Sequence, residues 1–168
     1  TPSNGAAQVG LIDTSGLAVH VAVSGDYAYV ADWDSGLQII NISDPNVPEL
    51  AGTCSTSGTA LNVAVNGDYA YVANNDKGLA IINVSAPSSP TLEATYSLSS
   101  NSQGIFVSGD YVYVAHWEGG ISKIDISNPS SPSLAGNFNT SGNSHGVVVS
   151  GDYIYVADYN NGLDILNN

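Results

Sequence analysis

One seven-residue motif, Gly-Asp-Tyr-x-Tyr-Val-Ala, is repeated four times along the chain at a constant step of 42 residues. The copies begin at Gly25, Gly67, Gly109 and Gly151, and four such steps account for all 168 residues. A fixed period of about 20 to 50 residues is the signature of a repeat architecture, in which each unit buries its apolar surface against its neighbours. The sequence therefore predicts four copies of one unit, which form a single domain over residues 1–168.

Each unit contains apolar or alternating segments of strand length and no helical periodicity. In the first unit we predict strands at residues 19–23, 26–31, 37–42 and 50–55. Gly25 lies between the first two strands, where a tight hairpin needs a residue that accepts positive φ. Two prolines, Pro45 and Pro48, stiffen the connection to the fourth strand. Four short strands per period, joined by hairpins, are typical of a propeller blade, so we predict an all-β propeller with four 42-residue blades per chain.

The two ends of the chain fall at complementary places in the repeat. Residues 8–13 match residues 50–55, a fourth strand, whereas the last unit ends after its third strand. The terminal strands can therefore pair in one shared blade and close a ring without an exposed edge. The closure could lie within one chain, which would give four blades. It could equally join two chains in a homodimer, in which each chain is half of an eight-bladed ring.

The charge balance is strongly acidic and restricts the partners. The net charge is −13, and the only basic residues are Lys77 and Lys123. A nucleic-acid backbone or an anionic membrane surface would need clusters of basic residues, so neither is an expected partner. No apolar run reaches the roughly 18 residues of a membrane-spanning segment. With 10% charged residues and much Ser, Asn, Gly and Thr, the composition suits an extracellular or cell-surface protein. The one cysteine, Cys54, cannot form an internal disulfide.

The repeated segments resemble a known family. Gly25-Asp-Tyr-Ala-Tyr-Val-Ala-Asp32, followed by Gly36-Leu-Gln-Ile-Ile-Asn-Ile-Ser-Asp-Pro45, is similar to the repeat of the LVIVD-repeat β-propellers, and all four periods carry the match. The resemblance implies blades around a central axis, with the first strand of each blade innermost. It also implies extracellular or cell-surface bacterial or archaeal proteins, usually with more than four blades. It implies no defined reaction.

The candidate site lies where the repeats differ most. In a propeller, the loops before the first strand of each blade share one rim with the hairpins between the second and third strands. Both tryptophans and all three histidines fall in these loops. Exposed aromatic rings beside Asp and Asn suit the recognition of a glycan or a protein. The predicted ligand-binding residues are His20, Asp32, Trp33, His116, Trp117, His145, Asp158 and Tyr159.

Two alternatives use the same rim. Asp32-x-Asp34-x-Gly36 resembles half of a calcium loop, although the remaining acidic ligands of such a loop are missing. Asp and Asn are also favoured in tight hairpins because their side chains bond to their own backbone. A metal-dependent or His/Asp-based hydrolase or lyase is the second alternative, but no nucleophile motif supports it. The sequence therefore favours a non-catalytic binding or scaffold module without a cofactor.

Overall fold

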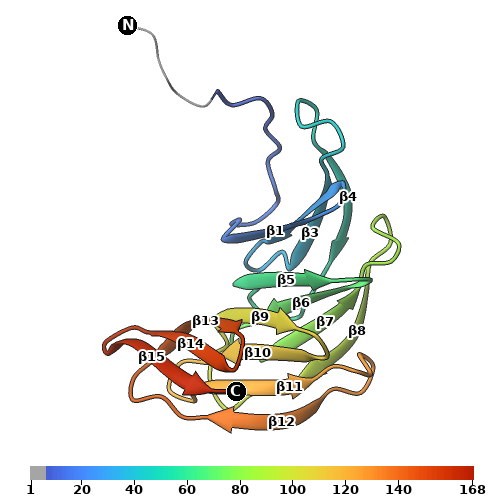
Figure 1. Ribbon diagram of the computed structural model, residues 1–168. Helices are drawn as coiled ribbons and strands as arrows, with labels where there is room; N and C mark the ends of the chain where they lie inside the picture. Colours follow the sequence, from blue (N-terminus) through green and yellow to red (C-terminus); the bar gives the residue numbers. More distant parts are fainter. Residues whose placement is uncertain (1–6) are drawn as a thin grey trace, which may run out of the picture.

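The computed structural model describes residues 7–168, which form fifteen strands and no helix. Blade 1 contains β1 (His20–Ser24), β2 (Tyr27–Ala31), β3 (Leu37–Asn41) and β4 (Glu49–Cys54); blade 2 contains β5 (Asn62–Asn66), β6 (Tyr69–Ala73), β7 (Leu79–Asn83) and β8 (Thr91–Tyr96). Blade 3 contains β9 (Gly104–Ser108), β10 (Tyr111–Ala115), β11 (Ile121–Asp125) and β12 (Ser133–Phe138); blade 4 contains β13 (Ser144–Ser150), β14 (Tyr153–Asp158) and β15 (Gly162–Asn167). Every blade is one antiparallel meander in chain order (Figure 1). Within the described part of the chain no helix could span a membrane.

The tight hairpin between the first and second strands is set by the repeated glycine. Ser24 pairs with Tyr27, so Gly25 and Asp26 form a two-residue loop. Gly25 has φ +56°, and nothing lies within 4 Å of the position that a Cβ would take. The backbone conformation therefore demands glycine here, as a turn with positive φ at its first central residue does. Gly67, Gly109 and Gly151 repeat the same geometry.

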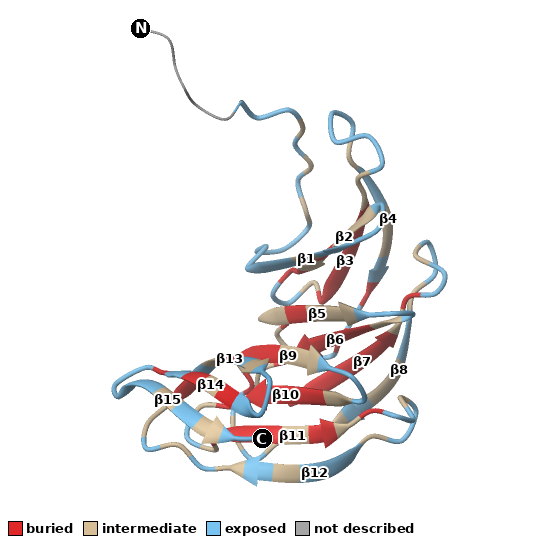
Figure 2. Cartoon of the chain, viewed as in Figure 1, coloured by how far each residue is buried: buried red, intermediate tan, exposed pale blue. Residues whose placement is uncertain are grey.

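The core lies between the blades. Tyr29, Leu37 and Ile39 of blade 1 pack against the face of blade 2 that presents Val63, Val72 and Ile82. Equivalent clusters join blade 2 to blade 3 and blade 3 to blade 4. Blades 2 and 3 therefore use both faces of their sheets, one for the blade before and one for the blade after, whereas blades 1 and 4 each pack through one face only. Figure 2 shows the buried segments concentrated in the middle of the molecule, with β1 and β15 largely exposed.

The four blades form an open arc. The innermost strands contact one another in chain order, with β1 beside β5, β5 beside β9, and β9 beside β13. Extensive contacts of this kind are absent between blades 1 and 4 within residues 7–168. These two blades lie at opposite ends of the arc in Figure 1.

The outer strand predicted at residues 8–13 is not formed. A strand needs a partner edge, and the open edge of blade 4 at β15 lies at the other end of the arc from these residues (Figure 1). Blade 4 consequently has three strands, whereas blades 1, 2 and 3 have four each.

Candidate functional site

The two sets of loops predicted to share a rim do meet. The hairpin between the second and third strands of each of the first three blades forms a short antiparallel bridge with a residue at or just before the first strand of the next blade. The bridged pairs are Trp33–Ala60, Asn75–Ser102 and Trp117–Ser144. In the first bridge, the Trp33 N–H donates to the Ala60 carbonyl at 3.2 Å, and the Ala60 N–H donates to the Trp33 carbonyl at 2.9 Å. The rim is thus tied together from blade to blade by backbone hydrogen bonds.

The bridging residues adopt an unusual backbone conformation. Trp33 has φ +52°, while Asn75 and Trp117 both have φ +46°. Asparagine tolerates this left-handed region, but for tryptophan it is costly. The bridge to the next blade therefore holds these two tryptophans in a conformation that they would not otherwise favour.

Asp32 begins this hairpin and anchors a loop. It is completely buried, accepting a hydrogen bond from the Thr14 hydroxyl at 2.7 Å and another from the Gly16 N–H at 2.8 Å. Asn74 plays the same part in blade 2, where it accepts from the Thr56 hydroxyl at 2.8 Å and donates to the Thr56 carbonyl at 2.7 Å. Asp32 was expected on the ligand surface, but its side chain faces inward because it satisfies the polar groups of a buried turn.

Asp158 occupies the same position in blade 4 and is also completely buried. One of its carboxylate oxygens accepts from the Asn161 side chain at 3.2 Å, and the other has no hydrogen-bond partner among the residues that the structure describes. Like Asp32, Asp158 is therefore not placed to meet a ligand at the surface.

His116 is the third of the expected ligand residues to be buried, with 2% of its surface exposed. Its Nε2 lies 2.8 Å from Ser122 Oγ, and the Ser122 hydroxyl donates to Asn137 Oδ1 at 2.7 Å. Because the hydroxyl hydrogen goes to Asn137, Nε2 of His116 carries the proton that bonds Ser122. Burial lowers the pKa of His116. The imidazole is therefore a buried neutral group whose hydrogen bond goes to Ser122 of the same blade.

The loop sequence changes in the repeat where His116 replaces the Asp or Asn that begins the hairpin in the other blades. The loop reads Thr-Ser-Gly at residues 14–16, 56–58 and 140–142, where the anchor is Asp or Asn. It reads Leu98-Ser-Ser100 where the anchor is His116. The two positions vary together within one chain, and this variation was the available signal of a structural role that the sequence analysis missed.

Three of the predicted residues do gather on the rim. The Trp117 ring lies 6.3 Å from the His145 ring and 6.1 Å from the Tyr159 ring, centroid to centroid, with interplanar angles of 59° and 34°. They come from the β10–β11 hairpin, the start of β13 and the β14–β15 hairpin. Tyr159 is 72% exposed, and His145 is exposed as well. We call Trp117, His145 and Tyr159 the aromatic cluster. Trp33 is 38% exposed and belongs to another part of the rim, at blade 1.

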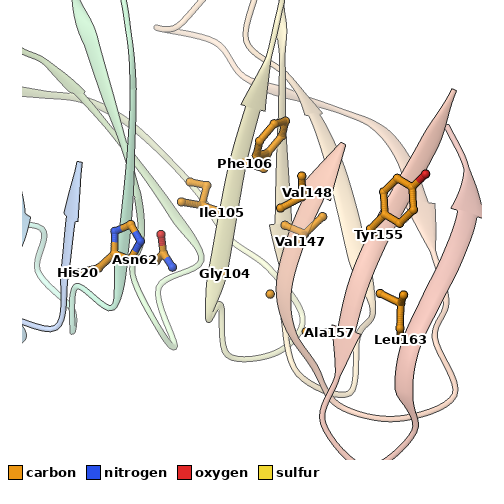
Figure 3. A pocket seen from close by; sticks show the side chains of 11 residues that line it. His20, Asn62, Gly104, Ile105, Phe106, Val147, Val148, Tyr155, Ala157 and Leu163 are labelled. Atoms are coloured by element: carbon orange, nitrogen blue, oxygen red, sulfur yellow. The ribbon is translucent and has the colours of Figure 1, made fainter. Parts of the chain in front are cut away.

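His20 lies away from this cluster, beside a hollow of about 440 Å³ on the inner side of the arc. Figure 3 shows His20 and Asn62 at one end of the hollow, and Tyr155 and Leu163 at the other. His20 Nδ1 accepts a weak hydrogen bond from the Val63 N–H at 3.4 Å, and burial lowers the pKa of His20. The hollow is lined mainly by apolar side chains from the innermost strands.

The residues do not fit the calcium site considered for Asp32 and Asp34. The Asp32 carboxylate bonds inward to Thr14 and Gly16, whereas the Asp34 carboxylate accepts from the Thr59 hydroxyl at 3.2 Å. Calcium needs about six to eight oxygen ligands. In residues 7–168, no three His, Cys, Asp or Glu side chains group closely enough to hold a metal ion.

Comparison with known proteins supports the fold. The model of the LVIVD repeat matches residues 15–56, 57–97, 100–140 and 141–167. Among the curated proteins, none matches. The chain is similar to the computationally designed Ika4 protein, with a TM-score of 0.79 and 10% identity, covering 97% of this chain and 98% of that one.

Two longer chains are also similar. The designed Ika8 protein has a TM-score of 0.74 and 9% identity, and BamB from Moraxella catarrhalis has a TM-score of 0.73 and 13% identity. The matches cover 90% and 93% of this chain, but only 46% and 48% of those chains. The chain therefore spans about half the length of these two relatives, and at such identities the likeness shows the propeller fold alone.

Proposed function

The chain belongs to the LVIVD repeat family, and from this premise we propose that it is a non-catalytic extracellular binding module that contacts a glycan or a protein through its rim loops. The aromatic cluster of Trp117, His145 and Tyr159 is the observation that carries the proposal. These side chains are outside the repeated framework, yet three separate segments bring them together. Aromatic rings at a surface, with polar groups beside them, bind ligands that have both apolar and hydroxylated faces.

The chemistry of the cluster favours a glycan. Tyr159 is 72% exposed and can offer a ring on which a sugar stacks, while Trp117 is half-buried beside it and His145 is exposed. Glu118 and Asn160, which follow two of these rings in the sequence, are exposed and can accept hydrogen bonds from sugar hydroxyls. A net charge of −13 makes a neutral glycan more suitable than an anionic one.

Binding has better support than catalysis on the same rim. A His–Ser pair is present, His116 with Ser122, but each residue is only 2% exposed, so a substrate has no access to the hydroxyl. The Ser122 hydrogen is also directed to Asn137 rather than to His116. General-base activation of a serine would need the opposite direction.

We also propose that the module works as a closed ring, in which the terminal strands pair in one blade, within one chain or between two. The support is the open edge at β15 and the fourth-strand sequence of residues 8–13. Closure would leave no unpaired sheet edge for aggregation, and an extracellular module needs such protection.

A glycan array followed by isothermal titration calorimetry tests the binding function. We expect Trp117→Ala to weaken glycan binding at least tenfold, because it removes the central ring of the cluster. Asn75→Ala is the matched control, since Asn75 occupies the equivalent hairpin position, with the same φ of +46°, and has no ring. It should leave binding unchanged. Equal binding by the Trp117→Ala chain would refute the aromatic cluster as the binding site, and the absence of any glycan ligand would refute a glycan as the ligand.

A further inference from the structure

The first blade has an uncovered sheet face that is buried in every other blade. Val63, Ile105 and Val147 face the preceding blade and are 2%, 8% and 6% exposed. Val21 is the equivalent residue in blade 1, and it is 56% exposed. Val19 and Val23, two residues to either side of Val21, lie on the same face and are 46% and 63% exposed. We call this surface the front face of the arc.

The last blade has the complementary surface. Leu37, Leu79 and Ile121 face the following blade and are completely buried, whereas the equivalent Leu163 of blade 4 is 63% exposed. Ile165 and Val148 lie on the same face and are also exposed. We call this surface the back face. Front and back faces are the two sides of the interface that the chain already makes three times internally.

The rim bridges show the same missing contact in the backbone. Trp33, Asn75 and Trp117 pair with Ala60, Ser102 and Ser144, and each pair is 27 residues apart. By the 42-residue period, the fourth hairpin offers Tyr159 and the start of blade 1 offers Ala18, and neither is bridged within the described chain. The three bridged hairpin residues have positive φ, whereas the unbridged Tyr159 does not. Tyr159 and Ala18 are thus the two halves of one absent bridge.

The N-terminal segment already occupies the place of a neighbouring blade's outer strand. A Cβ on Gly10 would lie 2.1 Å from the Pro45 carbonyl oxygen and 3.0 Å from Pro48 Cδ. Gly52 in β4 makes the same approach to the next blade, where the distances to Pro87 O and Pro90 Cδ are 2.3 and 2.9 Å. Thr14 and Gly16 fix the following turn on Asp32. Gly10 therefore approaches blade 1 as Gly52 approaches blade 2, although residues 8–13 pair with no sheet within the described chain.

We infer that a second copy of this chain covers both end faces, so that two chains form one eight-bladed ring. The front face of each copy packs on the back face of the other, and residues 8–13 of each copy add the fourth strand to β15 of the other. Two chains related by a two-fold axis make each contact twice and leave no face uncovered. This inference rests on the ring closure in the proposed function and does not depend on the ligand.

The shape of the arc favours a second copy over closure within one chain. Blades 1 and 4 lie at opposite ends of the arc (Figure 1), so closure within one chain would need a different arrangement of the blades. The arc superposes on 46% and 48% of two longer propeller chains, as half of a larger ring would. The hollow of Figure 3 is lined by Val148, Tyr155 and Leu163 of the back face, so a second copy would complete its wall.

Cross-linking between two differently marked chains tests the inference. One chain carries Ala18→Cys and the other carries Tyr159→Cys, and the two are co-expressed and treated with a short bis-maleimide. Residues opposite each other in an antiparallel pair have Cβ atoms about 4.5–5.5 Å apart, within reach of such a reagent. The double variant Trp33→Cys/Ala60→Cys is the geometric control, because this bridge exists within one chain. The native Cys54 is buried, and the unmodified chain controls for its reaction.

We expect a covalent pair that contains one chain of each kind, under conditions in which the control variant links internally and each single variant melts like the unmodified chain. If the control links and the marked chains remain single, the inference is overturned. An Ala18→Cys/Tyr159→Cys double variant that links only within itself would overturn it as well, in favour of a four-bladed ring. Failure of the glycan experiment would leave this result unaffected.

Discussion

Ile81 and Ile165 are the same residue at the same place in two repeats, yet Ile81 is completely buried and Ile165 is 56% exposed. Their strands and registers correspond, since Ile81 pairs with Tyr71 and Ile165 pairs with Tyr155. They differ in the neighbouring blade, because blade 3 covers Ile81 and nothing within residues 7–168 covers Ile165. In a repeat protein, burial is thus a property of the interface between units, and a terminal unit exposes residues that were selected for a core.

The largest expected effect is the difference in the free energy of unfolding lost when each of these two isoleucines is replaced by alanine. Ile81→Ala should lower the free energy of unfolding by about 2–5 kcal/mol, because it leaves a cavity in a packed interface. Ile165→Ala should cost as much only where two chains associate, and less than about 1 kcal/mol in a single chain. Urea unfolding at high and low protein concentration measures both. An Ile165→Ala cost that is independent of concentration would break the comparison.

The buried anchor of the first loop should have the next largest effect. Asp32→Ala leaves the Thr14 hydroxyl and the Gly16 N–H without their acceptor, which should cost about 1–3 kcal/mol. Asp34→Ala is the matched control, since Asp34 is exposed two residues away and should change stability by less than about 0.5 kcal/mol. Similar losses from the two variants would show that Asp32 is not an anchor.

The glycines of the tight hairpins should behave alike in inner and terminal blades. Gly67 and Gly151 both have φ +57° and open space around the Cβ position, so alanine at either site should cost about 1–2 kcal/mol from backbone conformation alone. Thermal unfolding of the two variants measures this cost. Equal losses here, beside unequal losses at Ile81 and Ile165, would separate what the local sequence determines from what the neighbouring blade determines.

The pH dependence contributed by His116 should be the smallest effect. Burial lowers the pKa of His116 below its ordinary value of 6.5, so the unfolded chain takes up a proton before the folded chain does. Its contribution to stability is complete above pH 6.5 and is lost as the pH falls from there toward the folded-state pKa. His116→Asn, which copies Asn74 of blade 2, should flatten the stability profile in this window.

Urea unfolding at several pH values in this window measures the slope of stability against pH for the unmodified chain and for His116→Asn. A slope that His116→Asn leaves unchanged would contradict the assignment of His116 as a buried neutral group.

The sequence predicted the local structure well, because the turn residues and the side-chain alternation that define the strands lie within each repeat. The repeated glycine and the alternating Tyr-x-Tyr pattern located the strands to within about one residue, with 19–23 observed as His20–Ser24 and 26–31 as Tyr27–Ala31. Turn chemistry and side-chain periodicity are local properties, and four copies of the motif reinforced one another. The strand at residues 8–13 was not formed, since a strand depends on an edge that the chain does not bring to it.

The candidate site was less predictable, because the direction in which a side chain points, rather than its position in the rim hairpin, decides whether it is exposed. Asp32, His116 and Asp158 share the rim hairpins with Trp33, Trp117 and Tyr159, but the first residue of the hairpin points into the turn and the second points out. Their polar character suggested a ligand surface when their partners were the loop groups of Thr14 or the side chain of Ser122. The grouping of Trp117 with His145 and Tyr159 required knowledge of which blades are adjacent.

The native mass of the unmodified chain, measured by light scattering at several concentrations, tests most directly whether the two end faces form an interface. A ring of two chains predicts a mass of twice the single-chain 17.2 kDa, with Leu163→Asp shifting the mass toward one chain. A mass near 17.2 kDa at every concentration would contradict the two-chain ring and would leave the front and back faces without a partner copy.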